Sequence, residues 1–394
     1  MMASRVARRS LHNLSSYRLP STIEEKLCTP ALIIYAEHVR WNIARVVAAC
    51  GSPTRWQPHI KTVKSSWALD ALCDAGVRHF KCATSREAEL LGSTLAARDG
   101  AFEVLVAFPH TGPTLARLGR TAARYAANVA WSVLVEDAAG AEGAVDAGLG
   151  VYVDVNCGMD RTGTSLDGAG DVLARVRAVA GTDLAGIHMY DGHAASLGDT
   201  ADARNAALFP LYDDLLALDG ALDLVTAGTP ALLPSLAHAG LRDSGRHRVS
   251  AGTVVLSDTR AEAQCPLGLR PAAVVASRVV STPLPRRFTL DAGVKALAAD
   301  AGHPMCAVLG HEGFEPLIPS EEHLPVAVRE PSDRPTKGDV FYLVPKHVCP
   351  TVNLAESALL VEEDGAFSEL PIEARAHPLF LDEGPVERAA RVAA

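Results

Sequence analysis

The stretch RWQPHIKTVKSSWALDALCDAGVRHFKCA (residues 55–83) decides the fold. It contains a β-rich run, an amphipathic Ala- and Leu-rich segment and a second β-rich run, which predicts a strand, a crossover helix and a parallel strand. The alternation continues to residue 256. The eight predicted strands are RWQPHIK (55–61), HFKCA (79–83), FEVLVAF (102–108), VAWSVLVE (129–136), VYVDVN (151–156), LAGIHMY (184–190), LDLVTAG (222–228) and HRVSAGTVVL (247–256). Eight strands with a crossover after each of the first seven indicate a closed (β/α)8 barrel of the TIM type.

Beyond residue 258 the character of the sequence changes, because helical periodicity fades and proline becomes more frequent. Short runs such as AAVVASRVV, RFTLDAG, VFYLV and SALLVEED predict antiparallel strands joined by turns. The early run ALIIY (31–35) has no place in the barrel and can pair with these strands instead. We therefore expect a barrel over residues 39–257 and a smaller β domain made of residues 1–38 and 258–394, which carries the metal motif described below.

Composition narrows the classes of function. The net charge is −9 and no long basic block follows the first residues, which argues against a nucleic-acid-binding surface. No apolar run reaches the length of a membrane span. The eight cysteines are scattered without a CxxC pair, which fits a reducing cytoplasm. The Arg- and Ser-rich start MMASRVARRSLHNLSSYR is compatible with a transit peptide, although a frayed N-terminus is the preferred interpretation.

Lys61 ends the first predicted barrel strand, and catalytic groups of such barrels gather at the C-terminal ends of strands. Partial burial there would favour the neutral amine and free it for imine chemistry, although on position alone an ordinary solvated lysine is the preferred interpretation. Phosphate sites often follow strands seven and eight, where the sequence has AGTP and SAGT. In these loops Gly228 and Gly252 allow close backbone approach, and Thr229 and Thr253 supply hydroxyl groups. The start of a helix at Thr229 would add free N–H groups for an anion.

The fifth and sixth strands lead to further polar groups. Arg161 follows strand five in a loop, from which it can reach a phenolate oxygen of a ligand. In GIHMYDGH (186–193), His188 and Tyr190 share a face, and His193 lies just beyond. The ring of Tyr190 can stack on a cofactor or steer a proton. For His188, a satisfied polar group of the core is an equally good interpretation.

The segment KHVCPTVN (346–353) places His347 and Cys349 two residues apart, so both side chains face the same way on an extended chain. Imidazole and thiolate form a soft pair suited to Zn²⁺, and two protein ligands leave positions for water and substrate. For a bare HxC motif, a buried cysteine beside a surface histidine is the commoner interpretation.

Taken together, these residues resemble the D-threonine aldolase and D-serine dehydratase family, fold-type III pyridoxal phosphate enzymes related to alanine racemase. The resemblance covers almost the whole chain. Its landmarks are TPALIIY (29–35), PHIKTVKS (58–65), ATSREAELL (83–91), MDRTG (159–163), GIHMYDGH (186–193), AGTP (227–230), SAGTVVLSD (250–258), LDAGVKAL (290–297), PSEEHLPV (319–326) and GDVFYLVPKHVCPTVNL (338–354).

The resemblance implies that Lys61 is the Schiff-base lysine, with Arg161 near the cofactor's phenolic oxygen and Tyr190 against its ring. It implies that His347 and Cys349 bind a divalent metal, Zn²⁺ or else Mn²⁺ or Mg²⁺, near the substrate's 3-hydroxyl. It also implies a homodimer in which each β domain completes the partner's active site. The candidate cofactor-binding residues are Lys61, His59, Arg161, Tyr190, Gly228, Thr229, Gly252 and Thr253. The candidate catalytic residues are Lys61, Tyr190 and His193.

The chain departs from the family pattern at two places. Val63 replaces the second histidine of the frequent HxKTHK motif, and AGTP replaces the usual Gly-Gly-Thr-Pro. At the metal, the family's aldolases tend to carry His-x-Asp and its dehydratases His-x-Cys, so Cys349 slightly favours dehydration.

We therefore expect a lyase that acts on a small D-configured 3-hydroxy amino acid. Lys61 would take the α-proton, and loss of the 3-hydroxyl would give a 2-keto acid and ammonia. If His193 or a metal-bound hydroxide instead removed the hydroxyl proton, glycine and an aldehyde would form. A racemase would need a second acid/base such as Tyr342, and a non-catalytic pyridoxal phosphate carrier would need neither the β domain nor the metal pair. The substrate's side chain stays open.

Overall fold

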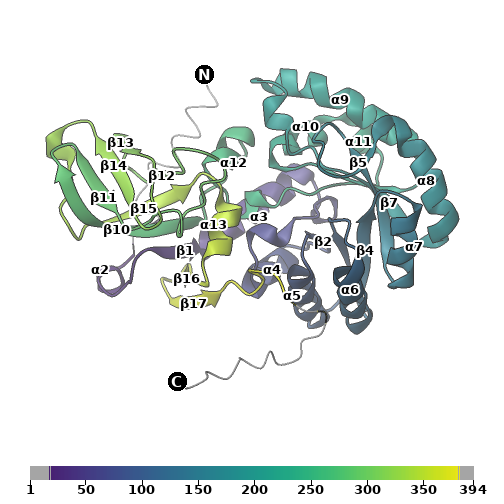
Figure 1. Ribbon diagram of the computed structural model, residues 1–394, viewed down its shortest axis with the longest axis horizontal. Helices are drawn as coiled ribbons and strands as arrows, with labels where there is room; N and C mark the ends of the chain where they lie inside the picture. Colours follow the sequence, from purple (N-terminus) through teal and green to yellow (C-terminus); the bar gives the residue numbers. More distant parts are fainter. Residues whose placement is uncertain (1–16, 18, 380, 382–394) are drawn as a thin grey trace, which may run out of the picture.

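The computed structural model describes residue 17, residues 19–379 and residue 381. The rest of the Arg-rich N-terminal stretch, and with it the choice between a transit peptide and a frayed end, lies outside the described residues. Within them, no helix combines the length and apolar character needed to cross a membrane. Figure 1 shows two bodies, a barrel surrounded by helices and a β-rich body beside it.

Seven parallel strands form the barrel sheet, in the order β2-β3-β4-β5-β7-β8-β9, with the short β6 paired to β5. Their bounds are β2 (His79–Cys82), β3 (Phe102–Val106), β4 (Val129–Val135), β5 (Gly150–Asn156), β6 (Thr164–Ser165), β7 (Leu184–Met189), β8 (Asp223–Thr226) and β9 (His247–Val249). The helices of the barrel are α3 (Ala36–Cys50), α4 (Ser66–Asp74), α5 (Ser85–Ala96), α6 (Gly112–Arg124), α7 (Ala138–Asp146), α8 (Leu166–Ala180), α9 (Ala201–Leu218), α10 (Leu232–Ala237) and α11 (Ala239–Asp243).

The predicted first strand, residues 55–61, is not a regular strand. Only Trp56 and His59 pair with neighbours, through single parallel bridges to β9 and β2 respectively. Pro58 lies between them and has no N–H to donate, which limits regular pairing. The segment nevertheless stands between β9 and β2 and joins the two ends of the sheet. The predicted barrel is confirmed, with seven regular strands and one bridged segment, and β9 ends at Val249 rather than at the predicted residue 256.

The barrel interior is layered. Leu105, Leu134, Tyr152 and Val225 form a buried apolar cluster inside it. A Cβ atom on Gly186 would lie 2.2 Å from the ring of Tyr152, so glycine is required for this layer to pack. Because side chains alternate along a strand, residues two positions further along face the same interior but one layer nearer the C-terminal mouth. On β5 the residue two positions beyond Tyr152 is the buried Asp154, which belongs to the polar groups of the site.

The second body is a largely antiparallel sheet in the order β13-β14-β11-β10-β1-β16-β17, with β15 paired to β10 and β12 to β15. Its strands are β1 (Ala31–Tyr35), β10 (Ala273–Leu284), β11 (Arg287–Leu290), β12 (Cys306–Val308), β13 (Phe314–Pro316), β14 (Leu324–Val328), β15 (Val340–Pro345), β16 (Ser357–Val361) and β17 (Phe367–Pro371). The smaller β domain is thus confirmed. ALIIY crosses over as expected, since β1 pairs antiparallel with β10 and parallel with β16.

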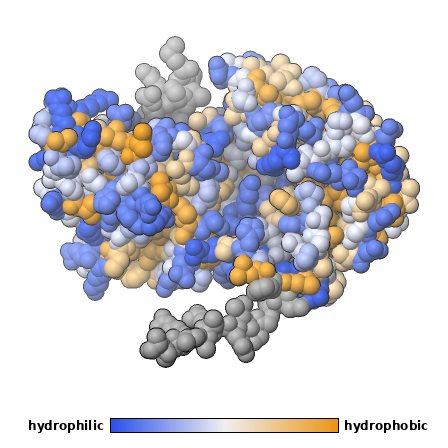
Figure 2. All heavy atoms as spheres, in the orientation of Figure 1, coloured by the Kyte–Doolittle hydropathy of each residue, from blue (hydrophilic) through white to orange (hydrophobic). Residues whose placement is uncertain are grey.

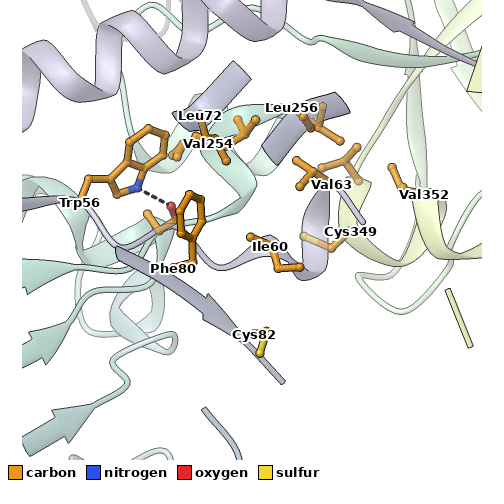
Figure 3. Close-up of a cluster of buried hydrophobic side chains, with 14 of the residues drawn as sticks. Trp56, Ile60, Val63, Leu72, Phe80, Cys82, Val254, Leu256, Cys349 and Val352 are labelled. Carbon is orange, nitrogen blue, oxygen red and sulfur yellow. Dashed lines mark hydrogen bonds between the residues drawn. The ribbon is translucent and has the colours of Figure 1, made fainter. Parts of the chain in front are cut away.

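One apolar core joins the two bodies. Figure 3 shows buried side chains that run from Trp56 and Phe80 in the barrel to Cys349 and Val352. The last two belong to α13 (Val348–Leu354), a short helix of the β-rich body. Its contact with the barrel fixes the C-terminal HxC motif against the turn that carries Lys61.

Candidate active site

Lys61 stands at the mouth of the barrel. It occupies a 3₁₀ turn over Ile60–Thr62, and its backbone N–H donates to Nδ1 of His59 at 3.3 Å. Its side chain is half-buried, and Nζ lies 5.8 Å from the centre of the Tyr190 ring. Tyr190 directly follows the last residue of β7. The structure therefore brings together the lysine and the tyrosine that the sequence assigned to one cofactor.

Two further cations face the same ring. The guanidinium carbon of Arg161 lies 4.9 Å and Nζ of Lys81 lies 5.5 Å from the centre of the Tyr190 ring. Across the described part of the chain, none of the cations on this ring forms an ion pair with a carboxylate. A small hollow bordered by Asn156, Arg161 and Tyr190 opens there. This donor set fits pyridoxal phosphate, because cations without carboxylate partners suit its phosphate and phenolate oxygens.

Lys81 was not among the residues that the sequence analysis assigned. It is fully buried on β2, where Nζ donates to Oγ of Ser250 at 2.7 Å and contacts Nε2 of His188 at 2.8 Å. Burial and, second, the charge of Lys61 lower the pKa of Lys81 to about 7. The available signal was a lysine in the middle of the strand run HFKCA. Both faces of such a strand are buried, and a lysine is rarely buried unless it has polar partners or a function.

His188 connects Lys81 to a carboxylate. Its Nδ1 lies 2.6 Å from Oδ1 of Asp154, and Thr162 donates to Oδ2 of the same carboxylate at 2.8 Å. Burial and, second, the charge of Lys81 lower the pKa of His188 to about 4. The imidazole is therefore neutral near pH 7, with its proton on Nδ1 towards Asp154 and with Nε2 accepting from Lys81. His188 is thus a satisfied polar group within the barrel.

The loop after β8 approaches Tyr190 closely. A Cβ atom on Gly228 would lie 3.1 Å from the Tyr190 ring, which leaves little room for any side chain. The Gly228 N–H donates to Oδ1 of the buried Asp191 at 2.8 Å, so this N–H is already occupied. Ala227 adopts a φ of +67°, a conformation that favours glycine, which accounts for the Gly-Gly-Thr-Pro usual in the resembled family. Thr229, also buried, begins the next turn.

The loop after β9 touches the Lys61 segment. A Cβ atom on Gly252 would lie 2.1 Å from the backbone oxygen of His59, so only glycine fits. The hydroxyl of Thr253 lies 3.3 Å from Sγ of Cys349. In the described structure these two residues therefore link the loop to the Lys61 segment and to the HxC motif. His59 is buried, and burial together with the charge of Lys61 lowers its pKa well below the ordinary value.

His347 and Cys349 lie together, but the predicted extended segment is wrong. His347 precedes the first residue of α13 and Cys349 lies in its first turn, because the chain after β15 turns into a helix. Sγ of Cys349 lies 3.0 Å from Oγ1 of Thr62. Burial raises the pKa of Cys349, but the hydrogen bond and charge of His347 outweigh this effect and hold it below the ordinary value. Figure 3 shows Cys349 facing the Ile60 and Val63 side of the Lys61 turn.

The donor chemistry of this pair fits a divalent metal. Nδ1 of His347 lies 2.6 Å from Oδ2 of Asp300, which leaves Nε2 for a metal in the arrangement common for metal-bound histidines. In the described ranges no group of three or more His, Cys, Asp and Glu side chains is arranged for a metal. His347 and Cys349 remain the two candidate metal ligands of this part of the chain.

His193 lies beside the loop after β5. Its Nε2 is 3.7 Å from the point where a Cβ atom on Gly158 would stand, so the ring packs on the loop after β5. Its Nδ1 is buried and lacks a hydrogen-bond partner within the described residues.

Figure 2 shows the surface hollowed between the β-rich body and the barrel, with hydrophilic residues along the hollow.

Two models of known protein families match the sequence of this chain. The family model described as "Alanine racemase, N-terminal domain" matches residues 34–233, about half of the chain. A second model, described as "Putative serine dehydratase domain", matches residues 272–361. The two matches fall on the barrel and on the β-rich body respectively.

Curated relatives carry aldolase names. A D-threonine aldolase of Arthrobacter sp is 32% identical over 232 residues, which cover 56% of this chain and 59% of that protein, less than two thirds of its length. A 3-hydroxy-D-aspartate aldolase of Paracoccus denitrificans (strain Pd 1222) is 26% identical over 376 residues, which cover 91% of this chain and 94% of that protein.

Solved structures share the fold. The D-threonine aldolase from Filomicrobium marinum superposes with a TM-score of 0.76 at 24% identity, covering 88% of this chain and 95% of that one. The D-threo-3-hydroxyaspartate dehydratase from Delftia sp. HT23 superposes with a TM-score of 0.71 at 22% identity, covering 89% of this chain and 98% of that one. The family matches and the named relatives together confirm the predicted resemblance to the D-threonine aldolase and D-serine dehydratase family. The chain belongs to the alanine racemase N-terminal domain family.

Proposed function

We propose that this chain is a pyridoxal phosphate- and metal-dependent lyase that removes water from D-3-hydroxy amino acids, giving a 2-keto acid and ammonia. One observation carries the proposal. The hydroxyl of Thr62, next to Lys61, lies 3.0 Å from Sγ of Cys349, so the amine and the HxC pair meet at one barrel mouth. A lyase of this kind needs a base at the α-carbon and a Lewis acid at the 3-hydroxyl, side by side.

The residues around Tyr190 would hold the cofactor. Arg161 would face the phenolate oxygen, and Thr229 would offer its hydroxyl group to the phosphate. The Thr253 hydroxyl lies against Sγ of Cys349 and would serve the metal pair instead. Gly228 and Gly252 would keep the backbone close without a side chain in the way. When bound, pyridoxal phosphate supplies a sink for the electron pair left at the α-carbon.

Lys61 would act as the base. Its amine is half-buried over the Tyr190 ring and forms no ion pair with a described carboxylate, so it is free to bind the cofactor and to take a proton. Tyr190 would limit the orientation of both the cofactor ring and the amine. Neutral His59, which accepts from the Lys61 backbone N–H, would hold the turn in place.

His347 and Cys349 would bind the metal, which would act as a Lewis acid on the 3-hydroxyl of the substrate. Asp300 would orient the His347 ring through Nδ1, and the Thr62 and Thr253 hydroxyls would position the Cys349 sulfur. These contacts tie the metal position to the turn that carries the base.

Retro-aldol cleavage to glycine and an aldehyde is the second candidate, because the curated relatives are named aldolases. It needs a base for the hydroxyl proton, and His193, whose Nδ1 has no hydrogen-bond partner among the described residues, is the candidate. Racemisation is disfavoured. The hydroxyl of Tyr342 donates to Oε2 of Glu24 at 2.6 Å within the β-rich body and is not free as a second acid/base.

The test is to incubate the purified protein, loaded with pyridoxal phosphate and Zn²⁺ or Mn²⁺, with D-serine, D-threonine and D-3-hydroxyaspartate. Keto acid and ammonia in equal amounts support dehydration, and glycine as the sole product would show that cleavage is the reaction. The L-enantiomers serve as the control. No product from any substrate, with cofactor and metal bound, would overturn the lyase proposal.

We also propose a homodimer, which light scattering of the same sample checks.

A further inference from the structure

We propose that Lys81 meets the ring nitrogen of pyridoxal phosphate, as a fixed hydrogen-bond donor on the floor of the barrel mouth. This inference rests on the cofactor of the proposed function and adds a contact that neither the motifs nor the family resemblance assigns. Its test can fail while the proposed function stands.

Lys81 is held in place from two sides. Its Nζ donates to Oγ of Ser250 at 2.7 Å and to Nε2 of His188 at 2.8 Å, and the Ser250 hydroxyl in turn donates to the backbone oxygen of Ala227 at 3.3 Å. Asp154 fixes the tautomer of His188 that can accept this bond. Both neighbours therefore accept a hydrogen bond from Lys81, and the donor and acceptor of each hydrogen bond in this network are defined.

A third N–H of the protonated amine has no hydrogen-bond partner among the described residues. The amine lies 5.5 Å from the centre of the Tyr190 ring, and the amine of Lys61 lies 5.8 Å from the same centre. Both lysines thus border the space over one aromatic ring. Lys61 stands on the turn at the barrel mouth, and Lys81 stands on the buried strand β2.

The cofactor has three kinds of acceptor: phosphate, phenolate oxygen and ring nitrogen. The proposed function gives the phosphate to the loops after β8 and β9 and the phenolate to Arg161. The ring nitrogen still needs a partner, and Lys81 is a buried donor over the Tyr190 ring with an N–H to give. A buried amine whose other two N–H groups are already bonded is restricted in position, so it can discriminate between ring atoms.

The charges around Lys81 support a donor role. Burial and the charge of Lys61 lower the pKa of Lys81, Asp154 and Asp191 oppose them, Arg161 adds a smaller lowering, and the result is about 7. An anionic cofactor adds negative charge beside the amine and so favours its protonated form. A protonated Lys81 would donate to the ring nitrogen and leave that nitrogen without a proton of its own.

The experiment compares two cofactors on three proteins. The cofactors are pyridoxal phosphate and its carbocyclic analogue, in which C–H replaces the ring nitrogen. The proteins are the wild type, Lys81→Met and Lys81→Gln, with affinities measured by absorbance titration. We expect Lys81→Met to weaken pyridoxal phosphate by about tenfold or more while changing the affinity for the analogue by much less. Lys81→Gln, which keeps an N–H donor, should recover part of the loss.

A control separates the contact from the general effect of removing a buried lysine. Lys64 is buried too, but its Nζ pairs with Glu87 at 2.6 Å. Lys64→Met should change the two affinities by the same factor. The ¹⁵N chemical shift of labelled cofactor on the wild type should report an unprotonated, hydrogen-bonded ring nitrogen.

Three results decide the matter. Equal losses for both cofactors in Lys81→Met, or a protonated ring nitrogen in the wild type, would overturn the Lys81 inference and leave the proposed function untouched. Failure of the wild type to bind either cofactor would overturn the proposed function itself. Thermal melting of each variant identifies any that does not fold, and Lys81→Gln and the ¹⁵N measurement then keep the inference testable.

Discussion

The Thr62 hydroxyl and the Cys349 sulfur lie 3.0 Å apart, although 287 positions separate the two residues in the sequence. Thr62 belongs to the turn of Lys61, and Cys349 to the first turn of α13. This contact places the proposed base and the proposed metal pair in one site, and it makes the β-rich body part of the chemistry.

The metal pair can be tested by removing one ligand. We expect Cys349→Ser to lower bound Zn²⁺ by at least tenfold, and turnover with it, because a hydroxyl is a much weaker ligand for Zn²⁺ than a thiolate. Cofactor absorbance should persist, since Lys61 remains. The measurement is metal analysis together with absorbance on the same sample. Cys306→Ser, at a buried cysteine on β12, is the control and should keep the metal. Full metal content in Cys349→Ser would contradict the assignment.

Gly252 should tolerate no side chain. A Cβ atom there would overlap the backbone oxygen of His59, so Gly252→Ala must displace the Lys61 turn. We expect a loss of about 2–4 kcal/mol in the free energy of unfolding and weaker cofactor binding. Urea denaturation and absorbance titration check both effects.

The matched control for this substitution is Gly170→Ala. Gly170 lies within α8 and has open space around its Cβ position. Alanine there should raise the free energy of unfolding by about 0.5–1 kcal/mol, because glycine is the poorer helix former. If both variants behave alike, the close approach of Gly252 to His59 is not real.

Acid should destabilise the protein partly through His247. This histidine is buried on β9 with Nε2 2.8 Å from Oγ1 of Thr226, and burial lowers its pKa to about 3. Between pH 6.5 and 3 the unfolded chain therefore binds a proton at this position that the folded chain does not, so stability falls as pH falls through this window. One such group contributes about 1.4 kcal/mol per pH unit.

His247→Gln removes that proton while keeping a polar side chain. We expect the loss of unfolding free energy between pH 7 and pH 5 to be smaller in the variant by about 1–2 kcal/mol, measured by urea denaturation at each pH. An unchanged pH dependence would mean that His247 titrates normally in the folded protein.

Much of the fold follows from local patterns. The apolar runs and crossover helices predict the barrel, and the run ALIIY correctly predicts a strand of the second sheet. The first strand was harder to predict, because the apolar pattern of RWQPHIK is compatible with a strand and only its pairing shows that Pro58 interrupts it. β12, β13, β14 and β17 were not predicted. β12 and β13 are three residues each, and such short elements depend on their sheet neighbours more than on their own sequence.

The sequence yields candidate site residues where a residue type carries its own signal, as with Lys61 or the HxC pair, and these assignments remain predictions. Lys81 was missed because its meaning depends on Ser250 and His188, which only the closed barrel brings near it. The predicted extended conformation of the HxC motif was also wrong. A helix begins at Val348, and the short segment VCPTVNL, with its proline, does not by itself predict this helix. The environment of Lys81 and the conformation of the HxC motif depend on contacts between segments far apart in the sequence, which the spacing of neighbouring residues does not show.

The central claim is that Lys61 carries the cofactor, and the most direct test is to trap the bond. The protein is mixed with pyridoxal phosphate, reduced with borohydride, digested and analysed by mass spectrometry, with Lys61→Ala treated in the same way. We predict one pyridoxyl group per chain, on Lys61, and none in the variant. A pyridoxyl group on Lys81 or another lysine in the wild type, or none at all, would contradict the account.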